Sequence, residues 1–235
     1  MIRRLILSRA IVALFSMWLF GTTSAQQVRL YPVDEAGKDR SFKIFRDKLI
    51  VAVKKHDRRF LLSILDPKII YSFGDDAGAK GFVKFWKLDS PNSKVWAELL
   101  TVLSMGGSFD NENGKKSFYA PYVSSRWEAI QNKIPGDEDA FCCGAIVSSK
   151  VKMQRRPDTA SPVVSLLSYD VVKMNHEGSI FKDEKQDELL WAKIKTLQGQ
   201  DGYVRGDQIR SPTDYRASFK KVRGRWVMYV FVAGD

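Results

Sequence analysis

The chain has 235 residues and a formal net charge of +11, from 38 Lys and Arg residues against 27 Asp and Glu residues. Because the basic residues are dispersed among acidic ones and form no long basic tract, the charge argues against a nucleic-acid-binding protein. The sequence shows neither internal repeats nor low-complexity runs.

Residues 1–25 have the features of a secretory signal peptide. Three arginines lie near the start, a nearly unbroken apolar run covers residues 10–20, and small residues precede a cleavage position after Ala25. The alternative is a single-span anchor, but the run is shorter than the ~20 residues that a bilayer core requires. The sequence therefore predicts a periplasmic or secreted bacterial protein, which contacts the membrane only transiently through the signal peptide.

The predicted mature chain stays basic. Removal of the three signal-peptide arginines from the 38 basic residues leaves 35 against 27 acidic residues, a net charge of +8. In a cell envelope this charge favours association with phospholipid head groups or anionic wall polymers. The alternative is a solvated surface that avoids aggregation.

The first part of the mature chain predicts helices followed by a strand. Residues 41–55 place apolar side chains at near-helical spacing, which is typical of an amphipathic helix. A shorter helix is expected next, with Asp57 as its cap and Asp66-Pro67 as its end. Residues 68–73 are expected to form a strand.

Two more helices and a strand are expected beyond this point. One helix runs through Phe82, and another begins at Pro91 with Ser90 as its cap and stops before Gly106-Gly107. Residues 117–124 predict a strand that is broken by a proline. This order indicates an α+β domain over residues 26–140, with a faint resemblance to the cystatin-like (NTF2/SnoaL-type) cone.

Residues 145–210 contain short β-type runs. Val151 and Met153 alternate with polar residues, and Ile194 and Val204 do the same, so these side chains are expected to face a common core. The runs and their loops cover residues 151–153, 155–162, 163–167, 171–174, 191–195, 199–204 and 207–209. This order resembles a bacterial SH3 (SH3b) domain, and the resemblance implies a small all-β SH3-like barrel.

This sequence departs from the SH3b pattern in two places. Tyr169-Asp170 stands where many SH3b domains carry a glycine before the third strand, and residues 176–188 form a long charged insert. SH3b domains commonly dock a peptide in a groove with aromatic and polar side chains. The residues that the resemblance assigns to this groove are Tyr169, Trp191 and Tyr203, with Arg155, Arg156 and Asp158 at its edge. The alternative is that Trp191 and Tyr203 fill the barrel.

The end of the chain, residues 211–235, predicts a β-hairpin. Two strand-like runs, 214–221 and 225–232, flank Arg223-Gly224. Because a lone hairpin is marginal in water, we expect it to complete the sheet of the N-terminal half. The SH3b-like segment would then be an insertion in one discontinuous domain.

No catalytic motif is present. The two histidines have ordinary local explanations, and HExxH, GxSxG and CxxC motifs are absent. Cys142 and Cys143 are the candidates for redox chemistry, as buried thiols, as a strained vicinal disulfide, or through intermolecular or metal chemistry. Zinc lacks further ligands, so we expect neither a metal nor a cofactor.

The sequence thus predicts a non-catalytic, exported cell-envelope binding protein whose SH3b domain recognises a peptidoglycan peptide or a protein partner. One alternative is a cone-like N-terminal domain that binds a small apolar ligand or is weakly hydrolytic, with Tyr71, Asp75 or Asp76 near its mouth. This alternative has only fold analogy behind it. The other alternative is a structural envelope protein.

Overall fold

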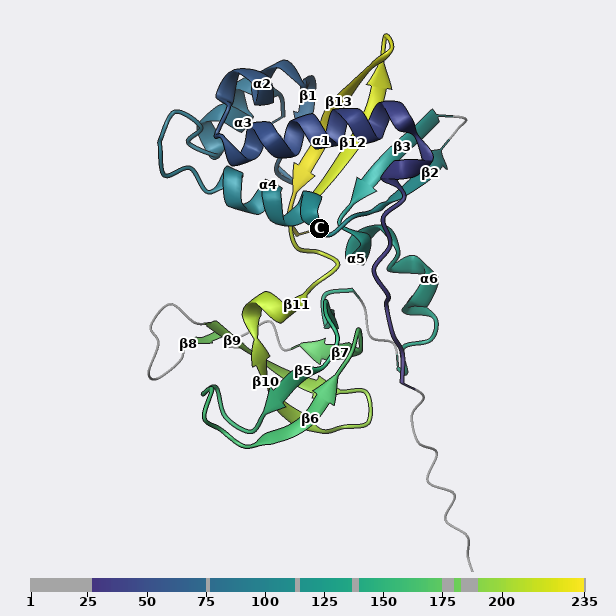
Figure 1. Ribbon diagram of the computed structural model, residues 1–235, viewed down its shortest axis with the longest axis vertical. Helices are drawn as coiled ribbons and strands as arrows, with labels where there is room; N and C mark the ends of the chain where they lie inside the picture. The colour runs from purple at the N-terminus through teal and green to yellow at the C-terminus, as the bar shows by residue number, and fades with distance from the viewer. Residues whose placement is uncertain are drawn as a thin grey trace, which may run out of the picture.

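The computed structural model describes residues 27–74, 77–112, 115–136, 140–174, 180–182 and 190–234. The predicted signal peptide, residues 1–25, lies outside the described residues. The fold is α+β and contains two sheets, which occupy the upper and lower parts of Figure 1. Within the described residues, no helix combines the length and the apolar character needed to cross a membrane.

The first sheet combines strands from both ends of the chain. Its spatial order is β1 (Leu65–Ile70), β13 (Arg225–Val232), β12 (Arg216–Val222), β3 (Lys115–Ala120) and β2 (Ser108–Glu112). β1 runs parallel to β13, and the other neighbours are antiparallel. The C-terminal hairpin is therefore part of the sheet of the N-terminal half, as its marginal stability in isolation predicts.

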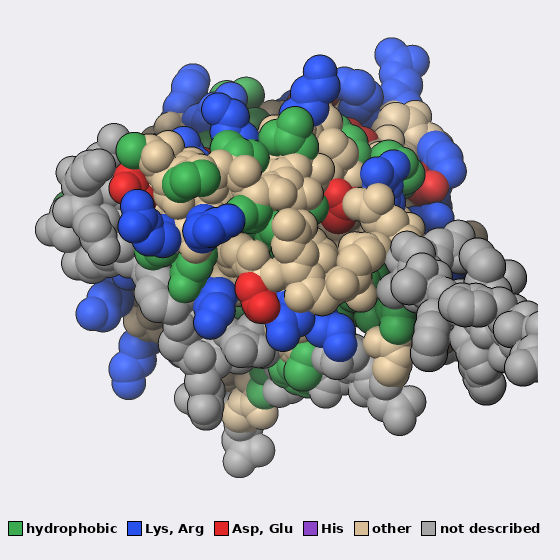
Figure 2. Space-filling model, turned by 90° about the horizontal axis from the view of Figure 1, so that it is seen from below, with side chains coloured by type: hydrophobic (Ala, Val, Ile, Leu, Met, Phe, Trp, Pro, Cys, Tyr) green, Lys and Arg blue, Asp and Glu red, His purple; other side chains and the backbone are tan. Residues whose placement is uncertain are grey.

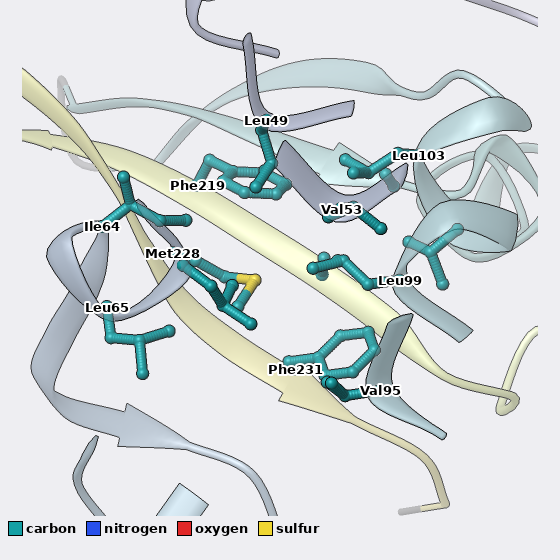
Figure 3. Close-up of a cluster of buried hydrophobic side chains, with 14 of the residues drawn as sticks. Leu49, Val53, Ile64, Leu65, Val95, Leu99, Leu103, Phe219, Met228 and Phe231 are labelled. Atoms are coloured by element: carbon teal, nitrogen blue, oxygen red, sulfur yellow. The ribbon is translucent and has the colours of Figure 1, made fainter. Parts of the chain in front are cut away.

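Helices cover one face of this sheet. They are α1 (Arg40–Lys54), α2 (Arg58–Ser63), α3 (Ala79–Phe85) and α4 (Val95–Ser104). Phe42 of α1 is fully buried, and its ring centroid lies 4.2 Å from that of Phe118 in β3 and 4.9 Å from that of Trp226 in β13. Figure 3 shows apolar side chains of α1 and α4, among them Leu99, directed toward Met228. This continuous core holds the helices on the sheet.

The start of α1 is fixed by Asp39. Its carboxylate accepts hydrogen bonds from the backbone N–H groups of Ser41 (2.9 Å) and Phe42 (3.2 Å), and from the Ser41 hydroxyl at 2.6 Å. The ammonium groups of Lys116 and Lys221 lie 3.6 Å from the same carboxylate. The Ser41 hydrogen bond is the largest influence and, with the backbone hydrogen bonds and Lys221, lowers the pKa of Asp39 to about 2.

Two proline positions differ from the sequence prediction. α2 ends at Ser63, and Asp66-Pro67 lies inside β1 instead of ending the helix. β1 is the outermost strand in the order of the first sheet, where a residue without an N–H is tolerated. α4 begins at Val95, not at Pro91, because the Ser90 hydroxyl caps a turn by accepting the N–H of Asn92 at 3.2 Å.

The strand predicted for residues 117–124 is also shorter than expected. β3 ends at Ala120, immediately before Pro121, and the next residues form the short helix α5 (Tyr122–Ser125). A second short helix, α6 (Glu128–Gln131), follows.

The second sheet is built from the middle of the chain. Its order is β11 (Ile209–Arg210), β4 (Cys143–Ile146), β7 (Val171–Met174), β9 (Leu190–Thr196), β10 (Asp201–Arg205), β5 (Val151–Gln154) and β6 (Val163–Leu167), with β8 (Ile180–Lys182) beside β9. Val151, Met153, Ile194 and Val204 share one hydrophobic cluster, so the alternation in the sequence identified the core face correctly.

The first and the last strand of the second sheet in sequence lie beside each other. β4 and β11 are antiparallel neighbours, with Ile146 opposite Ile209. All strands of the second sheet lie between β3 and β12 in the sequence, so this pairing returns the chain to the first sheet near the point where it left.

An N-terminal strap, residues 27–31, runs beside the second sheet and bridges to Asp170 before the chain enters the first sheet (Figure 1). Its Leu30 N–H donates to the Tyr169 carbonyl, and the Val171 N–H donates to the Val28 carbonyl, both at 2.9 Å. Val28 and Leu30 join a hydrophobic cluster with residues of α5, α6, β4 and β7. The strap therefore ties the two sheets together.

Asp170 anchors the strap. Its side chain is 3% exposed and accepts hydrogen bonds from Gln27 Nε2, from Arg29 Nε at 3.1 Å and from the Ser168 backbone N–H at 2.6 Å. A buried carboxylate requires such partners, because its desolvation is otherwise strongly unfavourable.

Replacing the α1 cap tests the role of Asp39. We expect Asp39→Ala to lower the free energy of unfolding by about 1–2 kcal/mol near neutral pH, and Asp39→Asn to lower it less, because Asn also caps helices. The folded-state pKa of about 2 lies below the ordinary value of 3.8. The contribution is therefore complete above pH 3.8 and is lost as the pH falls through about 2. Urea unfolding across this pH range measures the effect. If Asp39→Ala were destabilised as much at low pH as at neutral pH, this assignment would be wrong.

Removal of the Asp170 carboxylate should loosen the strap. Asp170→Ala leaves the Arg29, Gln27 and Ser168 donors without their acceptor, and we expect a loss of about 2–3 kcal/mol. The matched control is Asp47→Ala, which breaks an exposed pair with Lys43 that is worth about 0.5 kcal/mol. Chemical denaturation of both variants measures the loss of unfolding free energy. Equal losses in the two variants would show that Asp170 does not anchor the strap.

Candidate binding groove

A cavity of about 330 Å³ lies on the second sheet, in the volume range of small-ligand sites. It is formed by β5, the loop of residues 155–162, the start of β9, the end of β10 and the adjoining turn. The lining residues are Lys150, Val151, Lys152, Gln154, Thr159, Trp191, Arg205 and Gln208. We call this cavity the groove.

Strand register places Trp191 at the groove. Trp191 of β9 is directly opposite Arg205 of β10, so both side chains project from the same face. The intervening Ala192 and Val204 face the hydrophobic cluster on the other side. Trp191 is only 2% exposed, yet it does not belong to that cluster. It forms a buried wall of the groove.

The loop of residues 155–162 is held by its own polar side chains. The Gln154 amide donates to the Thr159 carbonyl at 2.9 Å and to the Ser161 carbonyl at 3.3 Å. Asp158 is buried and accepts the Ala160 N–H at 2.9 Å. Asp158 therefore shapes the loop, and Gln154 links the loop to the groove.

The groove is cationic. Lys150 and Lys152 are exposed, Arg205 is the third cation, and among the residues that the structure describes no Asp or Glu lines the groove. Asp207, outside the lining, forms a two-point pair with Arg205 at 3.0 and 2.8 Å. Figure 2, which views the molecule from the end of the second sheet, shows Lys and Arg side chains around this end with few acidic ones. Such a site attracts an anionic ligand.

Of the six groove residues that the resemblance assigned, Trp191 is in the lining. Tyr203 projects from the same strand face as Arg205, because it lies two residues earlier on β10. Arg155 and Arg156 are exposed on the loop, outside the lining.

Tyr169, which the resemblance also assigned to the groove, lies outside the groove lining. Its ring centroid is 5.5 Å from that of Tyr31 at the end of the strap, and its backbone φ is +59°. The residue adopts the left-handed conformation that a glycine adopts without strain. This is the position at which the sequence departs from the SH3b pattern. The strap hydrogen bond to the Tyr169 carbonyl supports this conformation.

Most of the groove lining cannot be recognised from the sequence. Lys152 alternates with two core residues, and Lys150 and Arg205 lie at strand ends, where charged side chains usually indicate only a solvated face. The signal that identifies them is the pairing of β5 with β10, which no local pattern predicts.

The described cysteines and histidine lie outside the groove lining. Both cysteines are thiols, Cys142 exposed and Cys143 buried. His56 stacks on Trp96 with ring centroids 5.1 Å apart, and His176 lies outside the described residues. Within the described part of the chain, no group of three His, Cys, Asp or Glu residues is arranged to hold a metal ion.

No protein-family model, curated protein or solved structure matches this chain. A functional assignment therefore depends on the residues of the groove and their geometry.

Removal of the Gln154 amide should free the loop of the groove. We expect Gln154→Ala to raise the rate of trypsin cleavage after Arg155 about tenfold, because two loop carbonyls lose their buried donor. The control is Gln200→Ala, which removes an exposed amide that donates to the Val164 carbonyl at 3.3 Å. Limited proteolysis with mass spectrometry measures both rates, and unchanged cleavage in Gln154→Ala would show that the amide does not hold the loop.

Proposed function

We propose that this chain is an exported, non-catalytic bacterial envelope protein whose second sheet is an SH3b-like unit that binds an acidic wall peptide. The groove is the binding site. The first sheet and its helices serve as the scaffold that holds this unit.

The order of the elements supports the SH3b-like assignment. β5, the long loop of residues 155–162, β6 and β7, the β9–β10 hairpin and β11 follow in the order that the resemblance implies. The left-handed Tyr169 further agrees with this assignment, because it occupies the position of the family's glycine.

The observation that carries the proposed function is the composition of the groove. Trp191 supplies an apolar wall, and the exposed Lys150 and Lys152 supply positive charge, while Gln154 holds the adjoining loop. Peptides of the bacterial wall carry carboxylates beside small apolar side chains, and charge-assisted hydrogen bonds to carboxylates are the stronger class. The net charge of +8 predicted for the mature chain steers it toward anionic wall material.

The small-ligand alternative for the N-terminal half has no specific observation in its favour. Tyr71 is buried, and its ring lies 5.5 Å from that of Phe85, inside the core instead of at a cavity mouth. Asp75 and Asp76 lie outside the described residues. A purely structural envelope role would leave the groove without a ligand, and the experiment below separates the two roles.

Sedimentation of the purified protein with peptidoglycan across a salt series tests the proposal. We expect retention that persists at high salt, and about fivefold weaker retention for Lys150→Gln/Lys152→Gln, which removes two cations from the groove. These exposed lysines are better test positions than Trp191, because truncation of a fully buried tryptophan disturbs folding.

The matched control is Lys54→Gln/Lys55→Gln, which removes the same charge from the exposed end of α1. If both double variants lose retention equally, the wall polymer attracts net charge only. If the wild type shows no retention, the groove does not recognise peptidoglycan.

A further inference from the structure

The helices α1 and α2 hold most of the excess positive charge of the chain. Residues 40–59, which cover α1 and the start of α2, contain eight Lys or Arg residues and two Asp residues, a net charge of +6. The net charge predicted for the whole mature chain is +8. The charge is therefore concentrated on one pair of helices.

Acidic partners neutralise only part of this charge. Three of the eight cations form ion pairs, which are Lys43–Asp47, Arg46–Asp34 and Arg58–Asp89, at 2.6–2.8 Å. The other five are exposed and form no ion pair within the described part of the chain; they are Arg40, Lys48, Lys54, Lys55 and Arg59. The outer side of α1 is therefore strongly cationic.

Two exposed aliphatic side chains lie among these cations. Ile44 is 47% exposed and Val51 is 52% exposed. Ile44, Lys48, Val51 and Lys55 follow one another at intervals of four, three and four residues, so they form a single row along the helix. Figure 1 shows α1 crossing in front of the first sheet, on which its opposite side packs, so this row faces away from the core.

We define the basic face of α1 by this row and the cations beside it. Its residues are Arg40, Ile44, Lys48, Val51, Lys54 and Lys55. A lipid surface matches both of its properties, because Lys and Arg are attracted to anionic head groups and short aliphatic side chains reach the boundary between head groups and acyl chains. An anionic wall polymer would satisfy the cations but would leave Ile44 and Val51 in water.

We propose that the basic face docks the protein on an anionic phospholipid bilayer. The helix lies along the bilayer surface, with its cations on the head groups and Ile44 and Val51 directed between them. This peripheral association goes beyond the transient contact that the signal peptide predicts. It is independent of the proposed function, because the basic face and the groove share no residue.

Vesicle co-sedimentation tests the proposal, with protein that begins at Gln26 so that the apolar N-terminal run takes no part. We expect binding to vesicles of equal parts phosphatidylglycerol and phosphatidylcholine, weaker binding as salt rises, and no binding to phosphatidylcholine alone. Lys48→Gln/Lys55→Gln should bind the anionic vesicles about tenfold more weakly. Glutamine is a good helix former, so α1 should persist, as circular dichroism will show.

The matched control is Lys150→Gln/Lys152→Gln, which removes the same charge from exposed lysines of the groove. It should bind the anionic vesicles within about twofold of the wild type. Equal loss in the two variants would show that the vesicles attract net charge alone and would overturn the proposal, as would absence of binding by the wild type.

The aliphatic side chains distinguish a lipid surface from any other polyanion. Ile44→Gln/Val51→Gln keeps every charge, and we expect about threefold weaker binding to the anionic vesicles, because less apolar surface leaves water. The control Val163→Gln/Leu166→Gln changes two exposed apolar residues of β6 and should bind as the wild type does. Unchanged binding in Ile44→Gln/Val51→Gln would contradict insertion of these side chains.

Peptidoglycan sedimentation separates this site from the groove. Lys48→Gln/Lys55→Gln should lose vesicle binding and keep retention on peptidoglycan, whereas Lys150→Gln/Lys152→Gln should show the reverse. If Lys48→Gln/Lys55→Gln instead loses peptidoglycan and keeps vesicle binding, the basic face binds wall polymer and the proposal is wrong.

Discussion

The pairing of β4 with β11 allows the second sheet to be inserted between β3 and β12. It places Ile146 opposite Ile209, on the first and the last strand of the second sheet in sequence, and so returns the chain beside its exit point. β12 then pairs with β3, with Phe219 opposite Phe118, and both rings lie near Phe42 in the core. Closing a long loop between β3 and β12 is entropically unfavourable, and a folded insertion whose ends already meet reduces this cost. The strap adds a second connection between the sheets through Asp170.

The groove follows from the outer face of one hairpin. Along β9 and β10, the pairs Trp191–Arg205 and Lys195–Asp201 project away from the hydrophobic cluster, whereas Ile194 and Val204 project into it. The groove lies toward the first pair. Polar side chains on this face cost little stability because the core forms on the other face. The hairpin therefore presents cations on a rigid support, which limits the entropy lost on binding.

Local patterns in the sequence predicted the elements whose periodicity is clear. The helical spacing around Phe42 and the alternation around Val151 and Val204 identified α1 and the core face of the second sheet. Pro67 and Pro91 misled the prediction, since proline is also tolerated in edge strands and turns. Trp191 could be predicted from the order of the runs, but Lys150 and Arg205 could not, because the pairing of distant strands brings them together. Tyr169 adopts a conformation supported by the strap, which lies far away in sequence.

We propose that ligand recognition takes place at the groove and not in the first sheet. An NMR titration of the isotopically labelled protein with a soluble disaccharide-peptide released from peptidoglycan distinguishes the two locations. We expect the largest shifts on the backbone amides of Lys152 and Thr159 and on the indole N–H of Trp191, while Leu99 and Met228 in the first core remain unchanged. Shifts centred on that core, or no shifts at saturating peptide, would contradict it.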